Sequence, residues 1–163
     1  MEENIDLINY SDNSKIWIFA PEKKLGVQET KLLQTKLEDF AINWVSHQNK
    51  LKATGFVLYD YFAILVVDNS LYPASGCSMD TLFRFISTLN IEFETDFLNR
   101  KLFQYLDKNE NLQIITQDEL APALASGAIT PETNFFDNLI TTLTELKSNW
   151  IKPFDQFWIS NLV

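Results

Sequence analysis

Small and polar residues that could carry out chemistry gather in one short segment, residues 74–80. Small side chains let backbone N–H groups approach a ligand, and the start of a helix attracts anions and lowers the pKa of a cysteine thiol. We therefore predict a ligand-binding site, in particular for a small anion, made by Ser75, Gly76, Cys77, Ser78 and Asp80. The same residue types are common in turns and caps, so the alternative is that Ser75 or Ser78 only caps a helix.

Cys77 also allows an enzymatic alternative, in which its thiol is a nucleophile or a redox-active group. In that hypothesis Ser75 and Ser78 help to position the substrate. A catalytic cysteine needs a general base, and His47 is the only histidine in the chain. The polar residues around His47 favour a simpler role at the end of a helix, where a histidine suits the helix dipole. We therefore expect no Cys–His dyad.

Two carboxylates flank the same loop, Asp68 at the end of an apolar run and Asp80 in the first turn of the next helix. Together they could hold a divalent cation or act as an acid–base pair. The alternative is structural, because an aspartate orders a turn and stabilises a helix start. One cysteine and one histidine exclude a tetrahedral Cys/His metal centre, and we expect no cofactor.

Aromatic residues are abundant, with 13 Phe, 5 Tyr and 4 Trp. Trp44 and Trp150 fall on predicted helical stripes, which favours core packing over a pocket for a flat ligand. Residues 154–158 form an aromatic tail outside any clear amphipathic pattern, and such residues make an interface if they are exposed. A protein partner or a homodimer is therefore among the expectations.

Periodicity predicts the elements that hold loop 74–80 in place. Short apolar runs predict strands at residues 15–20, 56–59, 62–67 and 102–106. Apolar residues at three-and-four spacing predict one helix over residues 27–48 and a second that carries residues 79–89. This order of elements is that of an α+β, ferredoxin-like βαββαβ core with an antiparallel sheet, spanning residues 15–106.

The rest of the chain is predicted to complete a single domain over residues 1–163, with an N-terminal extension at 1–14 and a C-terminal extension at 107–163. The elements expected there are a hairpin of 102–106 with 112–115, a short helix with a Thr116/Glu119 capping box that ends at Gly127, and a helical stripe from Phe136 to Trp150 that ends at Pro153. The apolar strands imply that the extension covers the sheet face that the helices leave open, a role that a dimer could also fill.

Composition limits the classes of partner. The net charge of -9 repels a phosphate backbone, which argues against nucleic acid as a partner. The longest apolar run, residues 62–67, is too short to span a membrane, and the amino terminus does not have the pattern of a signal peptide. We therefore expect an acidic cytoplasmic binding or interaction protein without a membrane segment, and the thiol enzyme is its alternative.

Four segments together resemble a family of short bacterial proteins: Lys15 to Ile18, residues 74–80, Phe136 to Leu139, and Glu145 to Trp150. Members of that family are often labelled "ABC transporter ATPase", although the family is functionally uncharacterised. The resemblance spans nearly the whole chain and implies no catalytic residues.

The ATPase label conflicts with the glycines of this chain. ATP hydrolysis of that type needs a glycine-rich phosphate-binding loop that ends in Lys-Ser or Lys-Thr. The 4 glycines are isolated, and Gly55 and Gly76 are followed by Phe56 and Cys77 rather than by lysine. The sequence therefore argues against an ABC-type ATPase.

Overall fold

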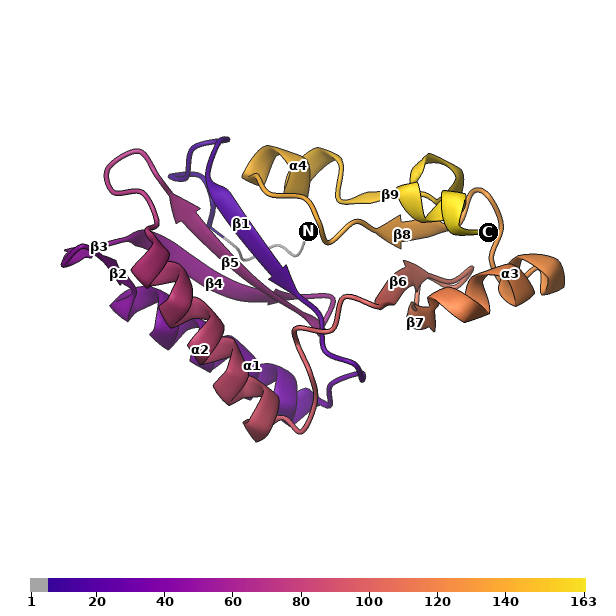
Figure 1. Cartoon of the computed structure of the whole chain (residues 1–163), viewed down its shortest axis with the longest axis horizontal. Helices are drawn as coiled ribbons and strands as arrows, with labels where there is room; N and C mark the ends of the chain where they lie inside the picture. Colours follow the sequence, from indigo (N-terminus) through magenta and orange to yellow (C-terminus); the bar gives the residue numbers. More distant parts are fainter. Residues whose placement is uncertain (1–5) are drawn as a thin grey trace.

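The computed structural model describes residues 6–163, which form two main antiparallel sheets at opposite ends of an elongated molecule (Figure 1). The N-terminal sheet has the strand order β1-β5-β4, and the second sheet has the order β7-β6-β8-β9. The predicted α+β class with antiparallel sheets is confirmed. Residues 1–5 of the predicted N-terminal extension lie outside the described residues.

The N-terminal sheet is built from three strands, β1 (Lys15–Phe19), β4 (Lys52–Leu58) and β5 (Phe62–Asp68). The predicted hairpin is confirmed, since β4 and β5 pair with Leu58 opposite Phe62. β5 lies in the middle and is buried along its whole length, as expected of a uniformly apolar strand covered on both faces.

Two helices of 17 residues, α1 (Val27–Asn43) and α2 (Gly76–Glu92), cover one face of this sheet (Figure 1). Their apolar stripes meet the sheet side chains that point to that face, with Leu33, Leu37, Leu82, Ile86, Phe19, Leu65 and Val67 in one core cluster. No helix of residues 6–163 is both long enough and apolar enough to cross a membrane.

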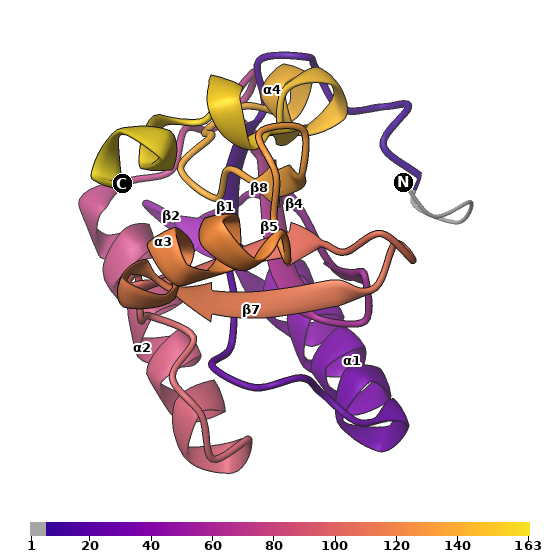
Figure 2. The same cartoon turned by 90° about the vertical axis from the view of Figure 1, so that its right-hand side faces the viewer.

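The C-terminal part of the chain covers the opposite face of the N-terminal sheet. Figure 2 shows α4 (Leu143–Ser148) above the sheet and α1 and α2 below it. The cluster on this side joins strand residues to residues around α4, and it includes Ile16, Ile18, Ile64, Val66, Phe136, Ile140, Leu143, Leu146 and Trp150. Both faces of the sheet are thereby removed from water.

The second sheet has its own core against a helix and the aromatic tail. Its elements are β6 (Leu102–Leu106), β7 (Leu112–Thr116), α3 (Gln117–Ser126), β8 (Asn134–Phe136), β9 (Ile151–Pro153) and the 3-10 turns η1 (Phe154–Gln156) and η2 (Trp158–Leu162). The predicted β6–β7 hairpin and the Thr116/Glu119 capping box are confirmed. Gly127 ends α3 as predicted, with a left-handed φ of 79° that favours glycine.

The four-stranded ferredoxin-like sheet expected over residues 15–106 is not formed. The first three strands have the expected order, but β6 pairs with β7 and β8 in the second sheet instead of joining the edge of β1. The start of that edge is occupied by a single antiparallel bridge between Lys15 and Thr142. β6 thus pairs with its hairpin partner β7 on one side and with β8 on the other.

Two predicted helices were also wrong in extent. The helix expected over residues 27–48 ends at Asn43, and a short hairpin of β2 (Val45–Ser46) and β3 (Asn49–Lys50) follows it. His47 and Gln48 form its turn with φ values of 49° and 68°, so His47 does not close a helix. The stripe expected from Phe136 to Trp150 contains β8, a loop and the six-residue α4 instead of one helix.

Candidate functional site

The loop singled out by the sequence, residues 74–80, holds the capped start of α2. Ser75 is the N-cap: its side chain accepts a hydrogen bond from the Ser78 N–H at 3.2 Å, and its own N–H donates to Ser78 Oγ at 2.6 Å. Ser78 is buried, and its carbonyl oxygen accepts from the Trp44 indole N–H at 2.9 Å. Both serines are therefore engaged in capping, which is the structural alternative stated for them.

The remaining predicted site residues of this loop, Gly76, Cys77 and Asp80, are exposed. A side chain added at Gly76 would meet no atom within 4 Å, so no close backbone approach requires glycine there. The Cys77 thiol makes no hydrogen bond to any described residue, His47 in the β2–β3 turn included. The structure does not bring these residues together into a catalytic group.

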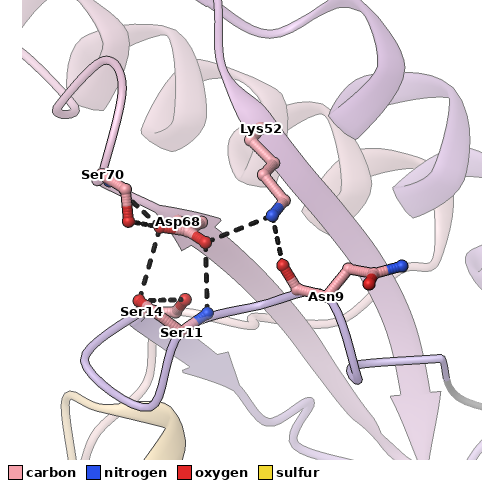
Figure 3. Close-up of polar contacts among 6 residues, drawn as sticks. All are labelled: Asn9, Ser11, Ser14, Lys52, Asp68 and Ser70. Atoms are coloured by element: carbon pink, nitrogen blue, oxygen red, sulfur yellow. Dashed lines mark hydrogen bonds and ion pairs between the residues drawn. The ribbon is translucent and has the colours of Figure 1, made fainter.

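Asp68 is buried and has internal partners on every side (Figure 3). Its carboxylate accepts hydrogen bonds from the hydroxyl and N–H of Ser70 and from the N–H of Ser11, and Lys52 Nζ lies 3.3 Å away. The Ser70 hydroxyl, followed by these other donors, holds the pKa of Asp68 well below its usual range despite burial. Asp68 thus ties the N-terminal segment to the end of β5.

These contacts argue against a metal site at Asp68 and Asp80. Asp68 directs its oxygens to protein donors, whereas Asp80 is exposed on α2. Within residues 6–163, no group of three or more His, Cys, Asp or Glu side chains is arranged to hold a metal ion.

The largest hollow near loop 74–80 runs along the outer edge of β1, and we call it the β1 groove. It has a volume of about 520 Å³ and is lined by residues 15–18, Asn69, Pro73, Ala74, Met79, Arg100 and residues 138–141. Ala74 and Met79 link it to the predicted loop, but the five predicted ligand residues do not line it. The structure therefore moves the candidate site from the exposed start of α2 to the edge of the sheet.

The β1 groove exists because the chain beside β1 pairs with the strand and then departs from it. The Ile16 N–H donates to Thr141 O at 3.0 Å, and the Leu143 N–H donates to Ser14 O at 2.9 Å. The next group in this ladder, the Thr141 N–H, turns away to Glu145 Oε1. The Ile18 N–H and the Ile16 carbonyl point to the same outer edge and meet no hydrogen-bonding partner among the described residues.

Two positively charged side chains, Arg100 and Lys15, line the groove together with these open backbone groups. Arg100 donates from Nη1 to Ile18 O at 3.0 Å, and its guanidinium lies 5.7 Å from the centre of the Phe19 ring. Burial lowers the pKa of Arg100, but an arginine keeps its charge at neutral pH. Lys15 lies at the other end of the groove and is exposed. None of the described residues that line the groove is acidic, although the chain carries 22 acidic residues.

A smaller, mostly apolar hollow adjoins the groove, and we call it the side pocket. It measures about 210 Å³ and shares Arg100, Asn138 and Leu139 with the β1 groove. Its other lining residues are Ala20, Asn99, Leu102, Phe103, Gln104, Phe136, Asp137, Phe157 and Trp158. The one acidic residue among them, Asp137, forms an ion pair with Lys152 at 2.8 Å. A charged group at Arg100 could therefore sit between a polar groove and an apolar pocket.

A series of hydrogen bonds, partly or fully buried, holds Asn138 in the wall that the two hollows share. Trp150 Nε1 donates to Asn138 Oδ1 at 3.0 Å, Asn138 Nδ2 donates to Gln104 Oε1 at 2.8 Å, and Gln104 Nε2 donates to the Tyr61 hydroxyl at 3.3 Å. The Tyr61 hydroxyl in turn donates to Pro21 O, and burial raises the pKa of Tyr61. This series of hydrogen bonds links Gln104 of β6 to Tyr61, which lies between β4 and β5. Because the side chains of both partners of Asn138 are held in this way, Asn138 stays in one position.

The aromatic residues divide between core and pocket. Trp44 and Trp150 are buried as predicted, although both lie just after a helix and not within one. Within the tail, Phe154 and Phe157 are buried against the second sheet, so the tail is not an exposed patch as a whole. Trp158 is 45% exposed, packs edge-on against Phe103 and stands at the side pocket.

Comparison of the chain with models of protein families, with curated proteins and with solved structures found no match. The resemblance to the family of short bacterial proteins therefore stays a prediction. The residue that sequence reasoning missed is Arg100. Its only signal is rarity, since Arg84 and Arg100 are the two arginines among 13 basic residues.

Proposed function

We propose that this protein is a binding protein whose β1 groove takes an anionic ligand with a carboxylate group. One observation carries the proposal: the groove is lined by Lys15 and Arg100 and by no acidic residue, on a chain with a net charge of -9. A cationic hollow on an acidic chain selects its ligand by charge. The proposed ligand is an anion, as expected for residues 74–80. The proposed site is the β1 groove, which Ala74 and Met79 of that segment line.

The donors in the groove fit a carboxylate in particular. A guanidinium presents N–H groups in a planar fork that matches the two oxygens of a carboxylate. The Ile18 N–H adds a backbone donor at the same edge, next to the carbonyl that Arg100 already contacts. A ligand that uses both would satisfy a backbone group that the fold leaves open.

The thiol enzyme receives no comparable support. Cys77 does not line the β1 groove, and no general base among the described residues is hydrogen-bonded to its thiol. The proposal therefore assigns the protein a binding role without a chemical step.

An NMR titration tests the proposal. At fixed ionic strength, 4-methylpentanoate is added to the 15N-labelled chain, and the uncharged 4-methylpentanamide serves as the matched control. We expect saturable shifts centred on the amides of Ile18 and Thr141 and on the Arg100 side chain for the carboxylate, and much weaker shifts for the amide. Equal shifts with both compounds, or shifts that avoid the groove, would refute carboxylate binding there.

A further inference from the structure

β1 is an edge strand, and its open backbone groups suit an extended peptide better than a small ion. Strand edges with free N–H and C=O groups bind extended peptides, which add a strand to the sheet. In β1 the Ile16 carbonyl and the Ile18 N–H are the open groups, and they face a hollow of about 520 Å³. The start of this edge pairs with Thr142, but beside Ile18 the position that a fourth strand would occupy is open, because β6 lies in the second sheet.

We infer that the ligand of the β1 groove is the carboxyl-terminal end of a partner polypeptide, held in an extended conformation beside β1. This inference rests on the proposed function and names its ligand class. The terminal carboxylate binds Arg100 and the Ile18 N–H, and the last side chain, a large apolar one, enters the side pocket. No bond is made or broken.

The arrangement of the two hollows fixes the direction of the peptide. Arg100 lines both hollows, so a carboxylate at Arg100 places the last side chain at the side pocket and the preceding residues in the groove. Ala20, which follows β1, lines the side pocket, and Lys15 lines the groove at the other end. The peptide therefore runs parallel to β1, from Lys15 towards Arg100.

Charge and spacing define a preferred sequence for the peptide. The backbone of Lys15 is already paired with Thr142, so only its side chain is available to the peptide. Lys15 precedes Ile18 by three residues, so at a rise of about 3.3 Å per residue the Lys15 side chain meets a peptide residue about three positions before the last one. An acidic side chain there meets the exposed ammonium of Lys15. The fitting end is acidic, small, small, large apolar, with a free carboxylate.

A second copy of this chain fits the groove less well. The edge of β1 is flanked by residues of loop 69–79 and residues 138–141, and its start already pairs with Thr142, so little of the edge remains for pairing with the same edge of another copy. The net charge of -9 per chain also opposes close pairing of two copies.

The test uses acetyl-Glu-Ala-Ala-Leu with a free carboxylate on the full chain, measured by calorimetry and by hydrogen exchange of the Ile18 amide. We expect this peptide to bind at least about tenfold more tightly than 4-methylpentanoate, because it adds backbone and Lys15 contacts. We also expect slower exchange at Ile18, because its N–H gains an acceptor. The carboxamide peptide and acetyl-Glu-Ala-Ala-Gly are the matched controls, and each should lose at least about tenfold in affinity.

The outcomes separate the two proposals. Binding of 4-methylpentanoate in the groove with no gain for the peptide overturns the peptide inference and leaves the carboxylate site intact. Absence of binding by any carboxylate overturns both. Equal affinity for the free-acid and carboxamide peptides overturns the role of the terminus, and concentration-dependent shifts at Ile18 in the free protein would show that a second copy is the occupant instead.

Discussion

Asp68 lies at the point where the chain after β5 meets the N-terminal segment, and its role follows from its donors. A carboxylate that accepts several hydrogen bonds and faces Lys52 is stabilised in its charged form, which is why the pKa of Asp68 is depressed in the folded state. In an unfolded chain the pKa of an aspartate side chain is about 3.9. This difference couples the stability of the fold to pH.

The sign of the coupling predicts the behaviour of Asp68→Asn. The charged carboxylate contributes stability that is present above about pH 4 and is lost as the pH falls further towards the depressed folded pKa. We expect Asp68→Asn to lower the free energy of unfolding at pH 7 by about 1–3 kcal/mol. We also expect it to lose less stability than the wild type between pH 7 and pH 3. Urea denaturation at both pH values measures this.

Ser70→Ala is the partner variant for that measurement, because the Ser70 hydroxyl is the foremost cause of the depressed pKa of Asp68. It should reproduce part of the loss at pH 7. An Asp68→Asn variant with the same stability as the wild type at pH 7, or the same decline towards pH 3, would contradict the structural role given to Asp68.

At the scale of elements, the packing of α1 on β4 depends on one glycine. A side chain added at Gly55 would lie 2.8 Å from the Leu37 carbonyl oxygen and 2.8 Å from Leu65 Cδ2. Atoms at that distance overlap, so α1 and β5 would have to shift. Gly55 therefore sets how closely the helix approaches the strand.

We expect Gly55→Ala to destabilise the fold by about 1–3 kcal/mol because of this overpacking. Gly76→Ala is the matched control, since nothing lies within 4 Å of its added side chain and alanine favours a helix. Thermal and urea unfolding of both variants measure the difference. Equal stability of the two variants would show that the close approach of α1 to β4 does not contribute to the free energy of unfolding.

Local patterns predicted most elements, whereas long-range pairing decided the rest. The β4–β5 hairpin and the Gly127 helix end depend on neighbouring residues and were predicted correctly. Capping by Ser75 was the stated alternative to its predicted ligand role, and it is the role that the structure shows. β6 was placed in the wrong sheet because its apolar pattern does not distinguish a place beside β1 from a place beside β8.

The candidate site shows the same limit. Ser75 and Ser78 have the residue types of a ligand loop, but they bond to each other. Arg100, Asn138 and residues 15–18 are far apart in the chain, and only the folded structure brings them to one groove. A helix was predicted around Phe136 because the three-and-four spacing of apolar residues continues through what is in fact a strand and a loop.

At the scale of the whole molecule, the groove runs along the edge of β1, between residues 69–79 and residues 138–141. The C-terminal part covers the face of the N-terminal sheet through Ile140 and Leu143, and it is held there by the hydrogen-bond chain from Trp150 to Tyr61. Because β6 belongs to the second sheet, the outer edge of β1 is left open beside Arg100. The β1 groove is thus a consequence of how the chain divides its strands between two sheets.

The central claim, that the β1 groove binds a carboxylate through Arg100, is tested most directly by the affinity of 4-methylpentanoate for two arginine variants. Arg100→Gln removes the groove cation, and Arg84→Gln makes the same charge change at an exposed position on α2 outside the groove. Calorimetry at fixed ionic strength measures both, thermal unfolding checks their folds, and Lys15→Gln provides a second groove variant. We predict at least about tenfold weaker binding for Arg100→Gln, weaker binding for Lys15→Gln and an unchanged affinity for Arg84→Gln. Equal affinities for the wild type and both arginine variants, or an equal loss in both variants, would contradict the account.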